Sequence, residues 1–211
     1  AEAHGATFGS QRVGSFGIAS AFSFYGNKVI TTGEGGMITV KCRDLDKKLR
    51  LKRDHGMSKH TRYYHEVIGF NYRMTNVQAA LGCSQLAKIE NIISRKREIF
   101  SLYKSHIAES ESITLNFEAN WAKSVFWLVN IHSNMTSHEV KQITKQLKTE
   151  GIDTRPFFVP ISQNPIYSDL PICKNASRIH EGSFSLPSSP KLNADDINFI
   201  SDKLNEVLKY V

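Results

Sequence analysis

The sequence predicts an α/β fold in which a strand and a flexible turn lead to a long helix and then to a small mixed α+β unit. Three observations support this order. Large and small residues alternate over residues 16–24 with the period of two that is typical of a strand. Apolar residues recur at three- or four-residue spacing at Leu86, Ile89 and Ile93, and again at Ile99 and Leu102, as in an amphipathic helix. The residues after 108 then mix strand-like and helix-like segments.

The predicted strand over residues 16–24 has two different faces. Its bulky face, which we expect to be buried, carries Phe16, Ile18, Phe22 and Phe24. The other face carries only small residues, among them Ser23. Small side chains on one face leave room for another group to approach the backbone closely, and Ser23 lies on that face.

A series of links and helices follows this strand. Residues 25–28 and the Gly-rich run 31–36 have the composition of turns. A short strand over 37–40 and a helix that ends near Gly56 come next. Thr75 with Gln78 three residues later has the form of a capping box. We expect one continuous helix from there to about residue 106.

This helix is long enough to bridge two lobes, and it sets the expected division of the chain. We predict a first domain over 1–107 and a small C-terminal domain over 108–211. Within the second domain, residues 126–131 resemble a strand, and 153–160 is an extended segment interrupted by prolines. Two helices are predicted, the first capped at Thr136 and ending at Gly151, the second capped at Asn193.

Composition narrows the class of protein. The chain has a net charge of +7, but its densest basic group, Arg95 to Arg97, lies on the predicted helix and is followed by Glu98. We interpret this group as a solvated helix face and not as a nucleic-acid patch. The excess positive charge also suits a small phosphate-bearing ligand.

Other features point to a cytoplasmic protein without a metal site. Cys42, Cys83 and Cys173 are scattered and form no ligand pattern. No apolar run approaches the ~18 residues that a membrane span needs. We therefore expect neither a metal nor a membrane.

Lys28 is the residue whose surroundings suggest chemistry. It follows a strand directly, in a stretch rich in Gly, Ser and Thr. An amine shielded from water in such a place becomes nucleophilic. The hydroxyl of Ser23, at the end of the strand, can donate a hydrogen bond to a phosphate. From the pattern alone, a surface lysine in a plain hairpin remains the commoner interpretation.

Longer motifs carry a family resemblance. The string from Ser23 to Met37, S-F-Y-G-N-K-V-I-T-T-G-E-G-G-M, resembles the lysine motif of the DegT/DnrJ/StrS-type sugar-nucleotide aminotransferases. Further stretches agree in order: R-D-H-G-M at 53–57, H-E-V-I-G-F-N-Y-R-M-T-N at 65–76, S-R-K-R-E-I at 94–99, D-T-R-P at 153–156 and L-P-S-S-P at 186–190. This resemblance implies the fold type I of pyridoxal 5'-phosphate (PLP) dependent transferases, represented here by part of the large domain and the small C-terminal domain.

The resemblance also implies roles for individual residues. Lys28 matches the catalytic lysine that bonds covalently to PLP, and Ser23 matches a hydroxyl that binds the PLP phosphate. Asn71 matches an asparagine that reaches the phosphate of the partner subunit. Glu2 matches a residue near the phenolic oxygen of the cofactor. Arg155 resembles a substrate-binding arginine, although a structural ion pair is an equal alternative, and Tyr64 and His65 are candidate substrate contacts.

The implied activity is transfer of an amino group from L-glutamate to a 4-keto-6-deoxy sugar on a nucleoside diphosphate, for the synthesis of surface polysaccharide. The implied assembly is a homodimer with shared active sites. The family's aspartate at the pyridine nitrogen would lie just before Ala1, so we expect a C-terminal part of a longer protein that is inactive by itself. Two alternatives compete with this function. A non-catalytic sensor of PLP or sugar nucleotide would not need the amine of Lys28, so the presence of Lys28 argues against it. A nucleic-acid binder would need aromatic and basic residues interleaved on one face, and we do not find this pattern in the sequence.

Overall fold

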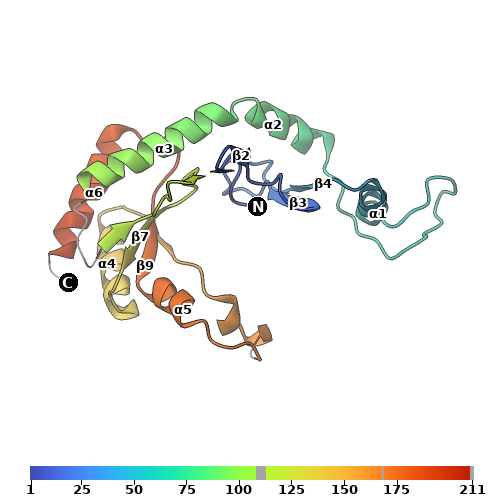
Figure 1. The fold of residues 1–211 in the computed structure, drawn as a ribbon. Helices are drawn as coiled ribbons and strands as arrows, with labels where there is room; N and C mark the ends of the chain where they lie inside the picture. Colours follow the sequence, from blue (N-terminus) through green and yellow to red (C-terminus); the bar gives the residue numbers. More distant parts are fainter. Residues whose placement is uncertain (108–112, 168, 210–211) are drawn as a thin grey trace. The chain divides into compact units, whose positions relative to one another are not determined.

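The computed structural model describes residues 1–107, 113–167 and 169–209, and they form two compact units. Unit 1 comprises residues 1–91 and 120–125, and unit 2 comprises residues 92–119 and 126–211 (Figure 1). The division falls inside helix α3, Ile89–His106, between Asn91 and Ile92. The predicted boundary between 107 and 108 adjoins residues outside the described part, and the two predicted domains stay a prediction.

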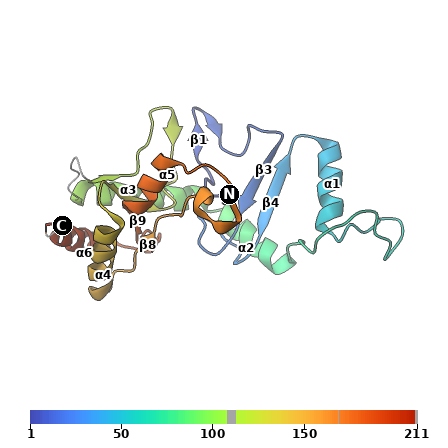
Figure 2. The same ribbon diagram turned by 90° about the horizontal axis from the view of Figure 1, so that it is seen from below.

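The two longest strands of unit 1 form an antiparallel pair. They are β3, Ala19–Ser23, and β4, Gly36–Val40, with Phe22 opposite Met37 and Ser23 opposite Gly36 (Figure 2). The predicted strand is therefore shorter than expected. Phe16 and Ile18 precede it and are exposed, so the prediction that they are buried is wrong for this part of the chain.

A second, three-stranded sheet in unit 1 joins distant parts of the sequence. Its order is β2-β1-β6, with β1 at Thr7–Phe8, β2 at Gln11–Arg12 and β6 at Ala122–Lys123. The rings of Phe8 and Trp121 lie 5.2 Å apart, and the Gly9 amide donates to the Trp121 carbonyl over 2.7 Å. These contacts explain why residues 120–125 belong to unit 1.

The helices of unit 1 correct one prediction. Helix α1, Arg43–Arg53, and the capping box at Thr75 that opens α2, Asn76–Leu86, were both expected. The single long helix is wrong, because α2 and α3 are separate. At the junction the Lys88 amide donates to the Gln85 carbonyl over 3.0 Å. This contact reaches back three residues, not the four of an α-helix, and interrupts the helical ladder.

Between α1 and α2 the chain crosses itself at two glycines. Gly56 has a φ of +65°, and a Cβ placed there would lie 1.9 Å from the Val67 carbonyl oxygen. A Cβ on Gly69 would lie 2.1 Å from the Gly56 nitrogen. Only glycine allows two backbones to pass this closely. The crossing closes a loop over residues 57–68.

Unit 2 is built on a four-stranded antiparallel sheet in the order β5-β7-β9-β8. The strands are β5, Ile113–Leu115, β7, Val129–Ser133, β8, Arg155–Pro156, and β9, Ser183–Leu186. The strand predicted over 126–131 thus begins three residues later. Phe126 lies before it with a φ of +45°.

Helices complete unit 2 and bury its core. They are α4, Ser137–Thr149, α5, Lys174–Glu181, and α6, Ala194–Leu208, with 3-10 turns at Ile161–Gln163 and Pro165–Tyr167. The predicted caps at Thr136 and Asn193 are confirmed, since each forms a full capping box. The fully buried side chains come from the sheet, α3, α4 and α6, and include Val129, Ile131, Tyr103, Ile143, Leu147 and Leu204.

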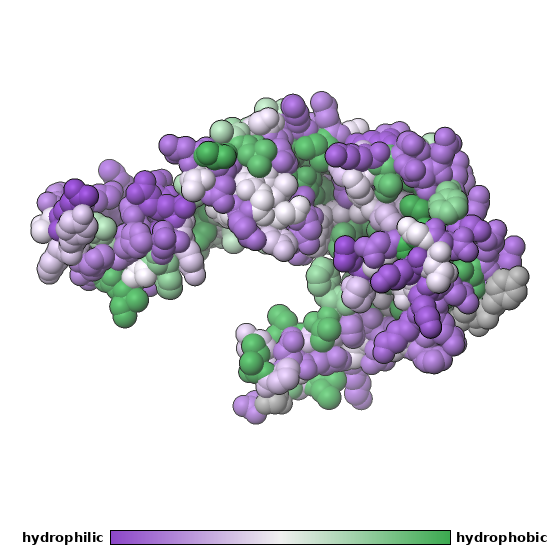
Figure 3. Space-filling view, turned by 180° about the vertical axis from the view of Figure 1, so that it is seen from behind, coloured by the Kyte–Doolittle hydropathy of each residue, from purple (hydrophilic) through white to green (hydrophobic). Residues whose placement is uncertain are grey.

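Large apolar side chains also remain on the surface of both units, as green areas among purple polar ones in Figure 3. Among the residues that the structure describes, no helix combines the length and apolar character needed to cross a bilayer. In the same residues no cluster of three or more potential ligand side chains is arranged to hold a metal ion.

Candidate active site

Lys28 is held in place by the residues on both sides of it. Its amide donates to the Tyr25 carbonyl over 3.0 Å, which closes the turn after β3. The next two residues, Val29 and Ile30, are buried. The hydrogen bond and the two buried residues fix the backbone of the turn, and with it the position from which the side chain of Lys28 extends.

The amine of Lys28 is paired with Glu2. Lys28 Nζ lies 2.7 Å from Glu2 Oε1, and the two side chains are 11% and 49% exposed, respectively. The lysine is thus largely shielded from water while its carboxylate partner is half open to solvent. This arrangement holds a candidate nucleophile at a fixed distance from a carboxylate.

The Gly-rich loop after Lys28 is locked by hydrogen bonds to its own threonines and to α2. Thr31 Oγ1 donates to the Phe24 carbonyl over 2.9 Å, and Thr32 Oγ1 donates to the Glu34 carbonyl over 2.6 Å. From α2, Gln85 Oε1 accepts the Thr31 amide and Gln78 Nε2 donates to the Glu34 carbonyl. The run T-T-G-E-G-G is therefore a fixed structure and not a flexible link.

Gly35 shows why this loop needs glycine. Its φ is +150°, and a Cβ there would lie 2.5 Å from Thr32 Oγ1 and 2.9 Å from Met74 Cε. Gly33, with a φ of +80°, has open space around it. The two positions differ in a way that experiment can separate, since only Gly35 combines an unfavourable backbone angle with a close approach.

Ser23 and His4 complete the surroundings of Lys28. Ser23 Oγ accepts the Tyr25 amide over 3.3 Å, a long contact that leaves its hydroxyl hydrogen available. His4 is 4% exposed between the rings of Phe22 and Phe24, at centroid distances of 5.8 and 5.9 Å. Burial lowers the pKa of His4, so its ring is neutral at pH 7.

The donor set fits a phosphorylated aldehyde such as PLP. A shielded amine at Lys28 suits a carbonyl carbon, and the hydroxyl of Ser23 suits a phosphate oxygen. His4 lies beside these groups, and its ring also interacts with the backbone of Ser23.

The remaining candidates of unit 1 lie together on the segment between α1 and α2. Asn71 is exposed and forms an isolated bridge with Asp54. His65 Nδ1 lies 2.8 Å from the His55 carbonyl oxygen, and the Tyr64 carbonyl accepts the Ser58 amide. The side chains of Tyr64, His65 and Asn71 are all at the surface, where a partner or a ligand can reach them.

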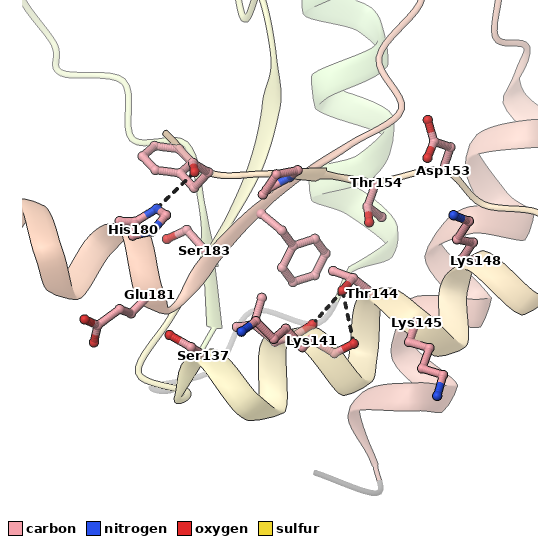
Figure 4. Close-up of a pocket in the computed structure, with 14 residues that line it drawn as sticks. Ser137, Lys141, Thr144, Lys145, Lys148, Asp153, Thr154, His180, Glu181 and Ser183 are labelled. Atoms are coloured by element: carbon pink, nitrogen blue, oxygen red, sulfur yellow. Dashed lines mark hydrogen bonds between the residues drawn. The ribbon is translucent and has the colours of Figure 1, made fainter. Parts of the chain in front are cut away.

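Arg155 lies in unit 2, on the edge strand β8. Its guanidinium is 75% exposed and pairs with Asp153 over 3.1 Å. Successive side chains of a strand point to opposite sides. Thr154 and Pro156 line a surface hollow of about 430 Å³, whereas Arg155 does not (Figure 4). Arg155 is therefore available on the other side of β8.

The hollow in Figure 4 is bordered by α4, β8, α5 and β9. Lys141, Lys145 and Lys148 of α4 lie along one border. On another, His180 Nδ1 lies 3.0 Å from the Phe157 carbonyl oxygen. This contact fastens the segment that follows Arg155 to α5.

The structure corrects the interpretation of the basic group on α3 as a solvated helix face. Lys96 is only 5% exposed, and the side chains of Arg95 and Arg97 are about one-quarter exposed, at 28% and 29%. Charge patterning missed Lys96 because burial depends on contacts with residues far away in the sequence. His4 was missed for the same reason, although the small residues around it were a signal that the chain packs closely there.

Comparison with solved structures gives the class of protein. Helicobacter pylori PseC, an aminotransferase involved in the biosynthesis of pseudoaminic acid, superposes with a TM-score of 0.90 at 28% identity, over 98% of this chain and 57% of that one. The putative sugar aminotransferase Spr1654 from Streptococcus pneumoniae, in its PMP form, gives a TM-score of 0.91 at 25% identity. It covers all of this chain and 56% of that one. The fold is that of PLP-dependent sugar aminotransferases, in part.

Sequence comparison then gives the family. The model of the DegT/DnrJ/EryC1/StrS aminotransferase family matches residues 1–205, and the chain belongs to this family. GDP-perosamine synthase of Escherichia coli O157:H7 is 38% identical over 98% of this chain and 56% of its own length. The corresponding enzyme of Caulobacter vibrioides is 37% identical over 99% and 57%.

The chain thus spans about half the length of the curated relatives that it matches. We use the term "whole protein" for a polypeptide of the relatives' length that contains this chain.

Proposed function

We propose that the whole protein is a PLP-dependent aminotransferase that acts on a nucleotide-linked keto sugar, with Lys28 as its catalytic lysine. The observation that carries this proposal is the pairing of Lys28 Nζ with Glu2 Oε1 at 2.7 Å, beside a loop that is fixed by hydrogen bonds. A surface lysine in a plain hairpin has neither an 89% shielded side chain nor a locked loop behind it.

Three residues of this chain would hold the cofactor. Lys28 would bond to its aldehyde carbon, Ser23 would donate to its phosphate, and Glu2 would lie near its phenolic oxygen. When bound, PLP supplies the electron sink that allows an amino group to pass between two carbon skeletons. Once released from the cofactor, the amine of Lys28 can carry a proton to and from the reacting carbon, because its backbone is anchored on both sides.

The proposed acceptor is a 4-keto-6-deoxy sugar on a nucleoside diphosphate, and the proposed donor is L-glutamate. Two relatives named GDP-perosamine synthase, at 37–38% identity, favour a perosamine-like product for surface polysaccharide. Arg155, Tyr64 and His65 are the proposed substrate contacts. The exposed guanidinium of Arg155 can pair in two-point fashion with a carboxylate or a phosphate, in exchange for its present contact with Asp153.

The proposed assembly is a cytoplasmic homodimer in which Asn71 serves the cofactor of the neighbouring subunit. Large apolar side chains are exposed on the segment that carries Asn71, among them Tyr63 at 73%, Ile68 at 88% and Tyr72 at 71%. A segment that exposes several large apolar side chains favours a protein–protein contact. Its position on the segment that bears Asn71 favours a shared site.

The test is covalent labelling. The whole protein is incubated with PLP, reduced with borohydride and digested, and the peptides are weighed by mass spectrometry. We expect one pyridoxyl group on Lys28, none in Lys28→Ala, and an undisturbed label in the control Lys41→Ala, which removes an exposed-loop lysine near β4. Labelling without any amino transfer from glutamate to a nucleotide keto sugar would favour a sensor of the same fold. Absence of the label would overturn the proposal.

A further inference from the structure

The side chain of Lys96 ends in a buried site made of oxygen atoms of Trp127 and Ser188. Its Nζ donates to the carbonyls of Trp127 and Ser188, each over 2.6 Å, and to Ser188 Oγ over 3.1 Å. Among the described residues no carboxylate pairs with it. Burial, without compensation from an opposite charge, lowers the pKa of Lys96 to about 8.

The number of acceptors matches the charged form of the amine. An ammonium group has three N–H donors, and three oxygens surround this one. A neutral amine has two donors and one lone pair, so the Ser188 hydroxyl, which now donates to the Trp127 carbonyl over 3.3 Å, has to turn and donate to the amine instead. Loss of the proton therefore breaks the hydrogen bond from Ser188 to the Trp127 carbonyl and removes the attraction of a positive charge for two carbonyl dipoles, and it loosens the site.

The backbone that Lys96 holds is strained. Phe126, directly before Trp127, is buried with a φ of +45°, which is uncommon for a bulky residue. Its ring stacks on Phe100 with a centroid distance of 3.6 Å and an angle of 7°. Arg97 lies over the same ring at 5.2 Å and forms two hydrogen bonds with Glu118, of 2.7 and 3.0 Å. One face of α3 thus fixes the sharp turn that positions Trp127.

Trp127 connects this anchor to the segment that follows Arg155. Its ring stacks on Phe158 with a centroid distance of 6.1 Å and an angle of 20°. Phe158 lies two residues beyond β8, whose Arg155 is paired with Ser185 of β9. The other acceptor, Ser188, lies two residues beyond the end of β9. Lys96 is therefore linked to β8, the strand of Arg155, in two ways. Trp127 stacks on Phe158 just after β8, and Ser188 follows β9, which pairs with β8.

We propose that Lys96 is a positioning residue for acceptor binding: its ammonium fixes Trp127 and Ser188, and the Trp127–Phe158 stack then holds the strand that presents Arg155. This inference rests on the proposed function only in the role given to Arg155. Lys96 itself contacts neither substrate nor cofactor in this scheme.

The pKa values of Arg97 and Tyr103, which lie beside the anchor, are raised and not lowered. The hydrogen bond with Glu118 raises the pKa of Arg97 above its ordinary value. The Tyr103 hydroxyl donates to the Pro187 carbonyl, and burial together with the charge of Asp196 raises its pKa as well. A change near pH 8 at Trp127 therefore reports Lys96.

The test follows Trp127 directly. The whole protein is prepared with 5-fluorotryptophan, and the 19F resonance of Trp127 is assigned as the one absent from Trp127→Phe. We expect this resonance to shift with a midpoint near pH 8, where the pKa of Lys96 lies. The shift should vanish in Lys96→Met and persist in Lys104→Met, which removes an exposed lysine of the same helix.

Kinetics provide the second readout. We define the KM ratio as the KM of the unmutated protein for the nucleotide sugar divided by that of Lys96→Met at the same pH. We expect this ratio to rise about tenfold between pH 7 and pH 9, with kcat little changed, as for a loss of ground-state positioning. The resonance needs no turnover, so it tests the anchor even if the whole protein transfers no amino group. No titration near pH 8 in the unmutated protein overturns the proposal without reliance on a variant. A titration that Lys96→Met removes while the KM ratio stays constant also overturns it, because Lys96 is then only structural.

Discussion

Glu2 Oε1 lies 2.7 Å from Lys28 Nζ, so the first residues of the chain and the turn after β3 meet at one ion pair. A carboxylate at this distance keeps the amine in one place.

Replacement of Glu2 by Gln tests this role. The amide keeps the size of the side chain but loses the charge that holds the amine of Lys28 in place, so we expect amino transfer by the whole protein to slow about tenfold. The borohydride label on Lys28 should still form. Asp202→Asn, an exposed charge-matched change on α6, serves as the control. Turnover of Glu2→Gln at the unmutated rate would contradict the assignment.

The loop behind Lys28 makes a second prediction. Gly33→Ala meets open space and carries only the backbone strain of a positive φ, about 1 kcal/mol. Gly35→Ala adds contact with Thr32 Oγ1 and Met74, and it displaces the hydrogen bond from Thr32 to Glu34, so we expect about 3 kcal/mol. Denaturant unfolding of the whole protein measures both. Equal losses would show that the loop is not packed as described.

Shared active sites can be tested by mixing inactive subunits. Lys28→Ala and Asn71→Ala should each abolish transfer. If Asn71 serves the neighbouring subunit, a hybrid dimer contains one complete site and one site that lacks both residues. A random equimolar mixture should then recover about a quarter of the original activity, provided that the two sites act independently. If hybrids form by mass spectrometry and no activity returns, Asn71 does not act across the interface.

The buried charge of Lys96 makes stability depend on pH. The pKa is about 8 in the folded protein and 10.5 in the ordinary solvated state. Between these values the unfolded state binds more protons, so the free energy of unfolding rises with pH across this window. The gain relative to Lys96→Met should approach about 3 kcal/mol. Unfolding of both proteins at pH 7, 9 and 10.5 measures it, and a difference that stays constant or falls with pH would be incompatible with a buried ammonium.

Local signals in the sequence predicted much of the fold. The capping boxes at Thr75, Thr136 and Asn193 depend on residues three positions apart, and all three are present. The turn that carries Lys28 and the strand at 37–40 were likewise expected from neighbouring residues. The family, the fold class and the type of enzyme were identified from ordered motifs, which the comparisons confirm.

Features that depend on distant contacts were not predictable in this way. The burial of Lys96 needs carbonyls from Trp127 and Ser188, which helical periodicity does not reveal. The end of α2 at Leu86 comes without a glycine or a proline to signal it. The site roles of Ser23, Asn71, Arg155, Tyr64 and His65 stay predictions, and the proposed experiments address Lys28, Glu2 and Asn71 directly.

The crossing of Gly56 and Gly69 has a consequence for how this family can diversify. Because the two backbones touch at that point, the loop over 57–68 is closed at its neck before Asn71 and α2 begin. Substitutions, insertions or deletions within the loop need not move the residues on either side of the crossing, α1 before it and Asn71 with α2 after it. Tyr64 and His65 lie on this insulated loop, whereas Lys28 lies on the framework. Under the proposed function, substrate contacts at Tyr64 and His65 can change while the proposed catalytic lysine stays fixed, provided that both glycines are kept together.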